Sequence, residues 1–160
     1  MGRLAQLTSP DTYFEDFIVG QTIRHARGKT ITNLENVNIT NMVMNTADGH
    51  FNIDRMSKSS FKDIVSYGGV NFSVVLGLAS QDTVENALAE LRLDKIRLRT
   101  LVVHGDTLYA YSQVIEKHDG DRADAGIVVF KHWGVNQDEK IVAELERTAL
   151  IKRRSHWAAK

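Results

Sequence analysis

The sequence predicts an α+β fold, in which an antiparallel sheet wraps around one long apolar helix. Helical patterns occupy the first part of the chain: a capped helix near residue 33 and an apolar segment at 70–79. Strand-like patterns separated by turns fill most of the chain from residue 96 onward. Helices followed by a run of strands are typical of α+β domains. A parallel sheet would instead need helices and strands that alternate along the chain.

The first predicted helix spans residues 33–44. Thr32 and Glu35 have the spacing of a capping box, with a hydroxyl at the N-cap and a carboxylate three residues later. The apolar side chains of this helix are expected to turn inward, among them Leu34, Val37 and Met42.

The apolar segment at 70–79 is assigned to a buried helix. Its length and β-branched content would also suit a buried strand. Gly77, Ala79 and the continuation through Gln81 favour a helix that its neighbours approach closely. A second, short helix is expected at 82–91.

The remaining elements are expected to be strands, preceded by an amphipathic opening at 13–18. Turn residues separate the later ones, so they are predicted to form an antiparallel meander. The predicted strands span residues 22–31, 96–103, 107–116, 125–135 and 141–153.

Composition predicts one soluble, cytoplasmic domain over residues 1–160, with a real hydrophobic core. The 20 basic and 20 acidic residues cancel, so nothing favours binding to nucleic acid or to an anionic membrane. Cysteine is absent, which excludes disulfides, thiolate nucleophiles and cysteine-ligated metals. The start of the chain lacks the apolar stretch of a signal peptide, and 70–79 is too short to span a bilayer.

The most informative stretch is residues 45–54, called here the His50 segment. Its ten residues include one histidine, two carboxylates and two carboxamides besides smaller side chains, and it lies between the two main predicted helices. Groups that exchange protons at the edge of an apolar element are what acid–base catalysis requires. The segment is therefore the leading candidate for an active site, the alternative being a polar surface loop.

The chain resembles the MaoC-like hydratases, which include the (R)-specific enoyl-CoA hydratases of the hotdog fold. Four places carry the resemblance, in the same order along most of the chain. They are the opening at 13–20, the His50 segment after a helix, the Tyr-Gly-Gly sequence within 64–70, and His-Gly-Asp-Thr-Leu at 104–108. The resemblance implies a single hotdog domain.

The family's catalytic pattern is Asp-x-Asn-Pro-x-His-x-Asp. With His50 on its histidine, Asn45 stands on the first aspartate, Ala47 on the asparagine, Asp48 on the proline and Asn52 on the last aspartate. An asparagine is no general base, so either Asp48 supplies a carboxylate from a shifted position, or His50 moves the proton and Asn45 orients water or the thioester. The form Asn-Thr-Ala-x-x-His-Phe resembles a branch of the family that acts on mesaconyl-CoA and related branched, carboxylated acyl-CoAs.

The resemblance implies that water adds across the double bond of a 2-enoyl-CoA. Histidine suits the proton transfers because its unperturbed pKa of about 6.5 is near working pH. Gly68 or Gly69, beside Tyr67, would hold the thioester carbonyl through backbone N–H groups at a helix N-terminus, unless the glycines only permit tight packing. A carboxylated acyl group would need a cation, and Arg55 is the nearest in sequence.

Other candidates rank lower. His104 opens a turn and is expected to be structural, whereas His132, beside Trp133, could face the core or solvent. The basic residues 152–154 could meet coenzyme A phosphates or form a solvated tail. No spacing predicts a metal site. The remaining histidines are expected to be exposed: His25, His118 and His156.

Three functions remain open at this point. The leading one is a hydro-lyase that acts on an enoyl-CoA and needs no cofactor beyond the coenzyme A of its substrate. The alternatives are a hotdog thioesterase with Asp48 activating water, and an acyl-CoA-binding domain without activity. The resemblance also implies a homodimer or a larger even assembly.

Overall fold

The computed structural model describes residues 3–4 and 12–158. The elements follow one another along the chain as β1 (Arg3–Leu4), η1 (Phe14–Asp16), β2 (Thr22–Thr30), α1 (Asn33–Met42), η2 (Asp48–His50), α2 (Ile53–Ser57), α3 (Gly68–Thr83), β3 (Ala87–Leu98), β4 (Thr107–Asp119), β5 (Ala125–Val135), β6 (Ile141–Lys152) and α4 (Arg154–Trp157).

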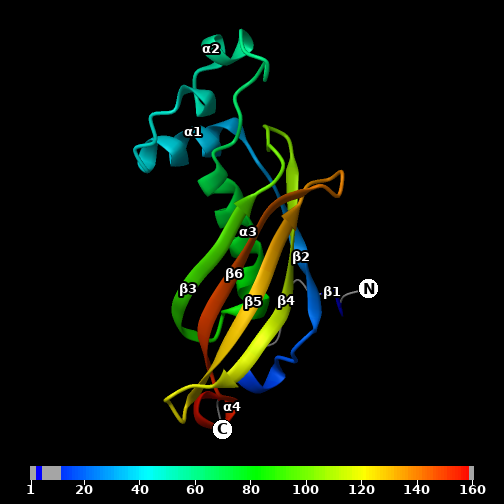
Figure 1. Cartoon of the computed structure of the whole chain (residues 1–160), viewed down its shortest axis with the longest axis vertical. Helices are drawn as coiled ribbons and strands as arrows, with labels where there is room; N and C mark the ends of the chain where they lie inside the picture. Colours follow the sequence, from blue (N-terminus) through cyan, green and yellow to red (C-terminus); the bar gives the residue numbers. More distant parts are fainter. Residues whose placement is uncertain (1–2, 5–11, 159–160) are drawn as a thin grey trace.

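One curved sheet wraps around α3 (Figure 1). Its strand order is β1-β2-β4-β5-β6-β3, and every pairing is antiparallel except that of β1 with β2. The predicted α+β hotdog architecture, with a sheet around a long apolar helix, is confirmed. The short elements α1, η2 and α2 lie together at one end of the molecule, and α4 lies at the other (Figure 1).

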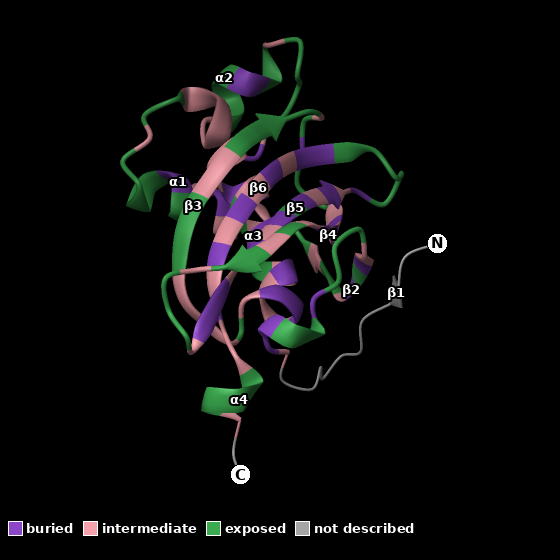
Figure 2. Ribbon diagram, turned by 60° about the horizontal axis from the view of Figure 1, so that its bottom comes forward, coloured by how far each residue is buried: buried purple, intermediate pink, exposed green. Residues whose placement is uncertain are grey.

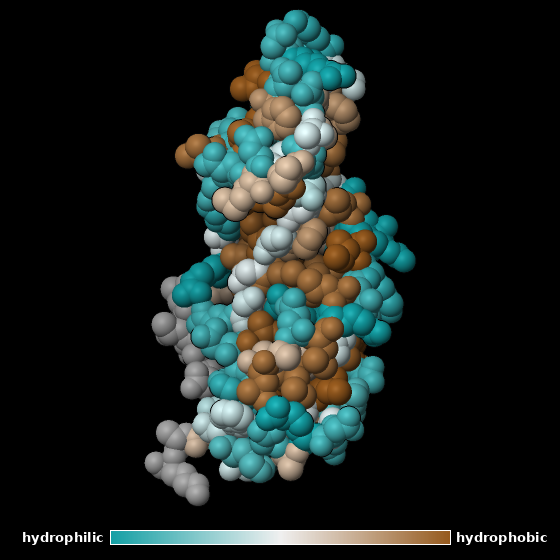
Figure 3. Space-filling model, turned by 90° about the vertical axis from the view of Figure 1, so that its left-hand side faces the viewer, coloured by the Kyte–Doolittle hydropathy of each residue, from teal (hydrophilic) through white to brown (hydrophobic). Residues whose placement is uncertain are grey.

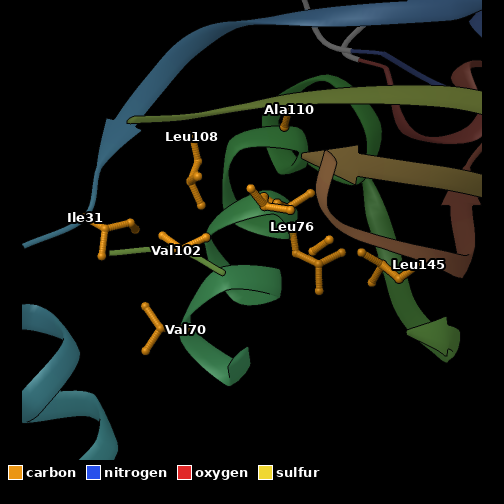
Figure 4. Close-up of a cluster of buried hydrophobic side chains, with 10 residues drawn as sticks. Ile31, Val70, Leu76, Val102, Leu108, Ala110 and Leu145 are labelled. Atoms are coloured by element: carbon orange, nitrogen blue, oxygen red, sulfur yellow. The ribbon is translucent and has the colours of Figure 1, made fainter. Parts of the chain in front are cut away.

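The core lies between α3 and the concave face of the sheet. Buried and less buried residues alternate along β4, β5 and β6, as period-2 strands with one buried face require (Figure 2). Figure 4 shows part of the resulting cluster, in which Val70 and Leu76 of α3 meet Leu108 and Leu145 of the sheet. A second cluster contains Phe14, so the opening of the chain packs against the same sheet.

The prediction of a short helix at 82–91 is wrong. The last turn of α3 includes Asp82 and Thr83, both buried, and Thr83 Oγ1 donates to the carbonyl oxygen of Ala79 at 2.7 Å. These polar residues therefore end a helix instead of starting one. The alternating sequence from Ala87 onward forms β3, which pairs with β6.

The predicted orientation of α1 is also wrong. The predicted N-cap is present, since Glu35 N donates to Thr32 Oγ1 at 3.3 Å, and the Thr32 hydroxyl donates to Glu35 Oε2 at 2.7 Å. However, the apolar Leu34 and Met42 are 72% and 79% exposed. The buried side chains of α1 belong to polar residues, Asn36 at 2% exposed and Thr40 at 0%.

A row of buried polar side chains crosses the sheet beneath the end of α3. His25 on β2 bonds Asp82 Oδ2 through Nδ1 and Ser112 Oγ through Nε2, both at 2.6 Å. Ser112 Oγ also forms a hydrogen bond of 2.7 Å with His132 Nδ1. The charge of Arg147, on β6, acts on His132. The expectation that His25 is exposed is wrong, because these partners bury it. Burial, followed by the charges of Arg147 and His25, holds the pKa of His132 well below 6.5.

Candidate functional site

A groove of about 510 Å³ opens where the first turn of α3 meets the end of β3. An isolated bridge between Val65 and Val103 fixes the segment that leads into α3. The groove is lined by His50, Val65, Ser66, Tyr67, Gly68, Gly69, Asn71, Phe72, Ile96, Leu98, Thr100 and Leu101. It therefore combines an apolar wall with a small number of polar groups, as small-molecule sites usually do.

His50 reaches this groove from the end of the 3-10 turn η2. Its ring nitrogen Nδ1 lies 2.9 Å from the carbonyl oxygen of Val65. A carbonyl can only accept, so Nδ1 carries the hydrogen and Nε2 of the neutral ring has a lone pair. The ring lies beside that of Tyr67, with centroids 5.5 Å apart. The His50 side chain is thus prepared to accept a proton at Nε2.

Tyr67, Gly68 and Gly69 line the groove at the N-terminus of α3. Tyr67 is the N-cap, and its side chain makes no capping hydrogen bond. The N–H groups of a first helical turn have no carbonyl partner within the helix, so they are available to a ligand oxygen. A Cβ on Gly68 would collide with the side chain of Leu98, and one on Gly69 with the ring of Tyr67. Both glycines therefore let the side chains of Leu98 and Tyr67 pack directly against the first turn of α3.

The other three predicted site residues lie outside the groove lining. Asp48 Oδ2 accepts from Arg55 Nη1 at 2.5 Å, and the guanidinium of Arg55 is largely exposed. Asn45 Oδ1 accepts from the backbone N–H of Ala47 at 2.9 Å, which closes a local turn. Local contacts thus occupy both groups that were considered as the second catalytic residue.

Sequence reasoning missed a buried polar pair in the groove. Ser66 Oγ donates to Asn71 Oδ1 at 2.7 Å, and both residues line the groove. Asn71 stands inside an otherwise apolar helix, and that contrast was the available signal. It also missed Asn36, whose carboxamide bonds to the backbone on both sides of the groove.

The lower-ranked candidates lie away from the groove lining. His104 accepts from the backbone N–H of Asn33 through Nδ1 at 3.2 Å, which agrees with a structural role. His118 and His156 are exposed, as expected. Arg153 pairs with Asp119 and Arg154 with Asp16, near the end of the molecule opposite α1 (Figure 1).

Two kinds of feature are absent from residues 3–4 and 12–158. Within them, no group of three histidine or acidic side chains is arranged to hold a metal ion. No helix in the same part of the chain has the length and hydropathy needed to cross a membrane.

The sequence model of the family described as "Mesaconyl-CoA hydratase" matches residues 6–153. The chain belongs to this family. A relative from Haloarcula marismortui, named mesaconyl-CoA hydratase, is 36% identical over 157 residues, which cover 91% of this chain. Those residues are 43% of the relative's length, so the chain spans less than half of it.

Solved structures agree with the family assignment. A protein from Chloroflexus aurantiacus, described as a putative MaoC domain protein dehydratase, is 26% identical with a TM-score of 0.84 over 92% of this chain and 46% of its own. A Mycobacterium tuberculosis protein described as having a double hotdog fold is 20% identical, with a TM-score of 0.81 over 93% of this chain and 46% of its own. The second likeness supports the hotdog fold alone.

Proposed function

We propose that this protein is a hydro-lyase that adds water to, or removes it from, a 2-enoyl-CoA thioester. The observation that carries the proposal is that His50 lines the same groove as the N-terminus of α3, which has no side-chain cap. The Nδ1 atom of His50 bonds to the carbonyl oxygen of Val65, which leaves Nε2 of the neutral ring as the proton acceptor. A proton acceptor and an oxyanion site on one apolar groove are the two groups that this reaction needs. Family membership supports the same reaction class.

In the proposed reaction, His50 Nε2 takes a proton from water, and the hydroxide adds to Cβ of the enoyl group. The electron pair of the double bond moves toward the thioester, whose oxygen becomes negative. The N–H groups of Gly68 and Gly69 would stabilise that oxygen, because the helix N-terminus adds its dipole to their hydrogen bonds. The imidazolium then returns the proton to Cα, so one molecule of water is added and no cofactor is consumed.

The proposed mechanism uses one base. Among the described residues that line the groove there is no aspartate or glutamate. Asp48 is bound by Arg55 and Asn45 by the backbone of Ala47, and neither residue is part of the groove lining. We therefore assign both proton transfers to His50.

The proposed substrates are short 2-enoyl-CoAs, including branched or carboxylated ones, of which mesaconyl-CoA is the example named by the relative. The groove lining contains neither lysine nor arginine among the described residues. A substrate carboxylate would then meet neutral donors such as the Nδ2 group of Asn71 and the hydroxyl of Thr100, or a cation from a second copy of the chain.

We also propose that two copies associate through the side of the molecule that carries β3. This side shows a broad apolar area bounded by polar ends (Figure 3). The strand β3 is at one edge of the sheet and carries the exposed Leu91, Ile96 and Leu98. Apolar areas of this kind commonly mark association sites. A second copy here would cover the mouth of the groove, since Ile96 and Leu98 line it.

The test is an assay of purified protein with crotonyl-CoA, a branched enoyl-CoA and mesaconyl-CoA. Loss of the ultraviolet absorbance of the enoyl thioester reports hydration, and a thiol reagent reports thioester cleavage. We expect hydration without thiol release, and a loss of about a hundredfold or more in kcat for His50→Gln.

His104→Gln is the matched control, because His104 also lies at a turn but is exposed and lies outside the groove lining. It should hydrate the substrates as the parent does. Thiol release in place of hydration would identify a thioesterase. Stabilisation by acyl-CoAs without turnover would identify a binding domain, and either result would reject the proposed reaction.

A further inference from the structure

The helix α1 buries two polar side chains and leaves most of its apolar side chains exposed. Leu34 and Met42 are exposed, whereas Asn36 and Thr40, one turn apart, are buried. Burying a carboxamide costs free energy unless its hydrogen bonds are made. The contacts of Asn36 therefore indicate what this orientation of the helix achieves.

The carboxamide of Asn36 connects the two segments that form the groove. Its Nδ2 lies 2.9 Å from the carbonyl oxygen of His50 and 3.5 Å from that of Val65. Its Oδ1 lies 2.8 Å from the backbone N of Tyr67, the N-cap of α3. One buried side chain thus contacts the backbone of the proposed base, the residue that orients its ring, and the start of the oxyanion helix.

Hydrogen-bond chemistry fixes the orientation of this carboxamide. The N–H of Tyr67 can only donate, and the carbonyl oxygens of His50 and Val65 can only accept. One placement of Oδ1 and Nδ2 satisfies all of them, and the flipped placement satisfies none. Asn36 is therefore specific in chemistry as well as in shape.

The two segments also contact each other directly. Val65 N donates to the carbonyl oxygen of Gly49 at 2.9 Å, while His50 Nδ1 donates to Val65 O. These bonds depend on the separation between the segments, and Asn36 sets that separation because it bonds to both. A change at Asn36 would therefore reach His50 through the backbone and not through the ring itself.

We infer that Asn36 is a positioning residue of the site: it holds His50 against Val65, so that Nδ1 keeps the hydrogen and Nε2 faces the groove unprotonated. This inference rests on the proposed function for its consequence in catalysis, but its structural part concerns the free protein. Displacements of about 1 Å in a catalytic group can cost about a hundredfold in rate.

The principal variants are Asn36→Leu and Asn36→Asp. The first removes every hydrogen bond of the carboxamide at similar volume. The second keeps an acceptor for Tyr67 N–H and removes the donor to His50 O, so it tests the donor alone if the leucine variant does not fold. Thr40→Val is the matched control, because Thr40 lies on the same buried face and its hydroxyl has no hydrogen-bond partner among the described residues.

The first measurement is the ring ¹⁵N spectrum of histidine-labelled protein without ligand. The signals of His50 are identified by their loss in His50→Gln. We expect the parent and Thr40→Val to show the neutral ring protonated at Nδ1. We expect both Asn36 variants to show a mixture of the two tautomers.

The second measurement is steady-state hydration of the best substrate across a range of pH. We expect kcat to fall about 10- to 100-fold for the Asn36 variants, as for groups that orient another residue, with a much smaller change in KM. In the His50→Gln background, Asn36→Leu should have no further effect on kcat. Thr40→Val should retain the kcat of the parent.

A folded Asn36 variant with the tautomer and kcat of the parent would overturn the inference. So would a Thr40→Val protein whose tautomer changes to the same extent, since that would show a general response to changes in α1. If the parent hydrates no enoyl-CoA, the proposed function fails, and the ¹⁵N spectra still decide whether Asn36 positions His50.

Discussion

Six histidines occur in the chain, and their hydrogen-bond partners separate them into distinct roles. His50 donates to a backbone carbonyl through Nδ1, and its side chain lines the groove. His25 and His132 bond side chains in the buried polar row, where Ser112 joins them. A ring with one nitrogen fixed by the backbone and the other facing a groove is suited to proton transfer, whereas rings bonded within the core are suited to packing.

The role of Asp48 can be tested directly. Because its carboxylate is bound to Arg55 outside the groove lining, we expect kcat for Asp48→Asn to fall far less than the about hundredfold loss that follows removal of a catalytic acid or base. Steady-state hydration measured beside His50→Gln provides the comparison. Equal losses in the two variants would return Asp48 to the mechanism as the second catalytic group.

The buried His132 predicts how stability depends on pH. Its pKa in the folded protein lies well below 6.5, because burial and then the charges of Arg147 and His25 disfavour the imidazolium. The unfolded chain therefore binds more protons between these two pKa values, and the free energy of unfolding falls as pH drops below about 6.5.

Urea unfolding of the parent and of His132→Gln at several pH values checks this dependence. The slope of unfolding free energy against pH below about 6.5 should be smaller in the variant, whatever its absolute stability. An unchanged slope would show that other groups cause the acid sensitivity.

At the scale of the elements, α3 packs closely against the sheet at Gly134 of β5. A Cβ at Gly134 would collide with the side chain of Val75, which is fully buried on α3. Helix and strand therefore meet at a position that admits hydrogen alone. Rigid packing here supports the groove, because the same helix carries Gly68 and Gly69 at its N-terminus.

Gly134→Ala should lower the free energy of unfolding by about 1–3 kcal/mol, because the added methyl group must displace α3 or β5. Denaturant unfolding measures this change. Gly120→Ala is the control, since a Cβ there would make ordinary contacts with Ile127 at 3.5 Å. Similar decreases in unfolding free energy for the two variants would show that an added methyl group is tolerated no better at Gly120 than beside α3.

The elements differ in how far the sequence determines them. The strand β5 was predicted with its observed ends, because turn residues at 118–121 and 136–139 mark both of its ends in the sequence itself. The orientation of α1 could not be predicted in this way, because Asn36 is buried by bonds to His50 and Tyr67, which are distant in the chain. His25 was misassigned for the same reason: its partner Asp82 is 57 residues away.

The candidate site shows the same division. The histidine and the glycines were predictable because their residue types and spacing carry the chemistry of the family. The hydrogen bond from His50 to Val65 was not, since it depends on how two separate segments meet. The pairing of Asp48 with Arg55 was not predictable either, and neither of these two predicted site residues lines the groove.

At the scale of the whole molecule, the edge of the sheet at β3 and the exposed apolar residues beside it remain without a partner in the described part of this single chain. The chain spans 43% of the length of its relative from Haloarcula marismortui. Association along β3 would enclose the groove, and exclusion of water strengthens the electrostatic interactions that the proposed reaction uses.

Leu91→Lys tests this association. Leu91 is 50% exposed on β3, and a lysine at an interface would introduce a charge that must be desolvated. We expect the parent to sediment as a dimer and the variant to dissociate at micromolar concentration, with weaker hydration because the groove is left open to water. Leu34→Lys is the control: Leu34 is more exposed, but it lies on α1, away from the strand edge. A dimer that persists in Leu91→Lys, or that dissociates in Leu34→Lys instead, would place the contact on another face of the molecule.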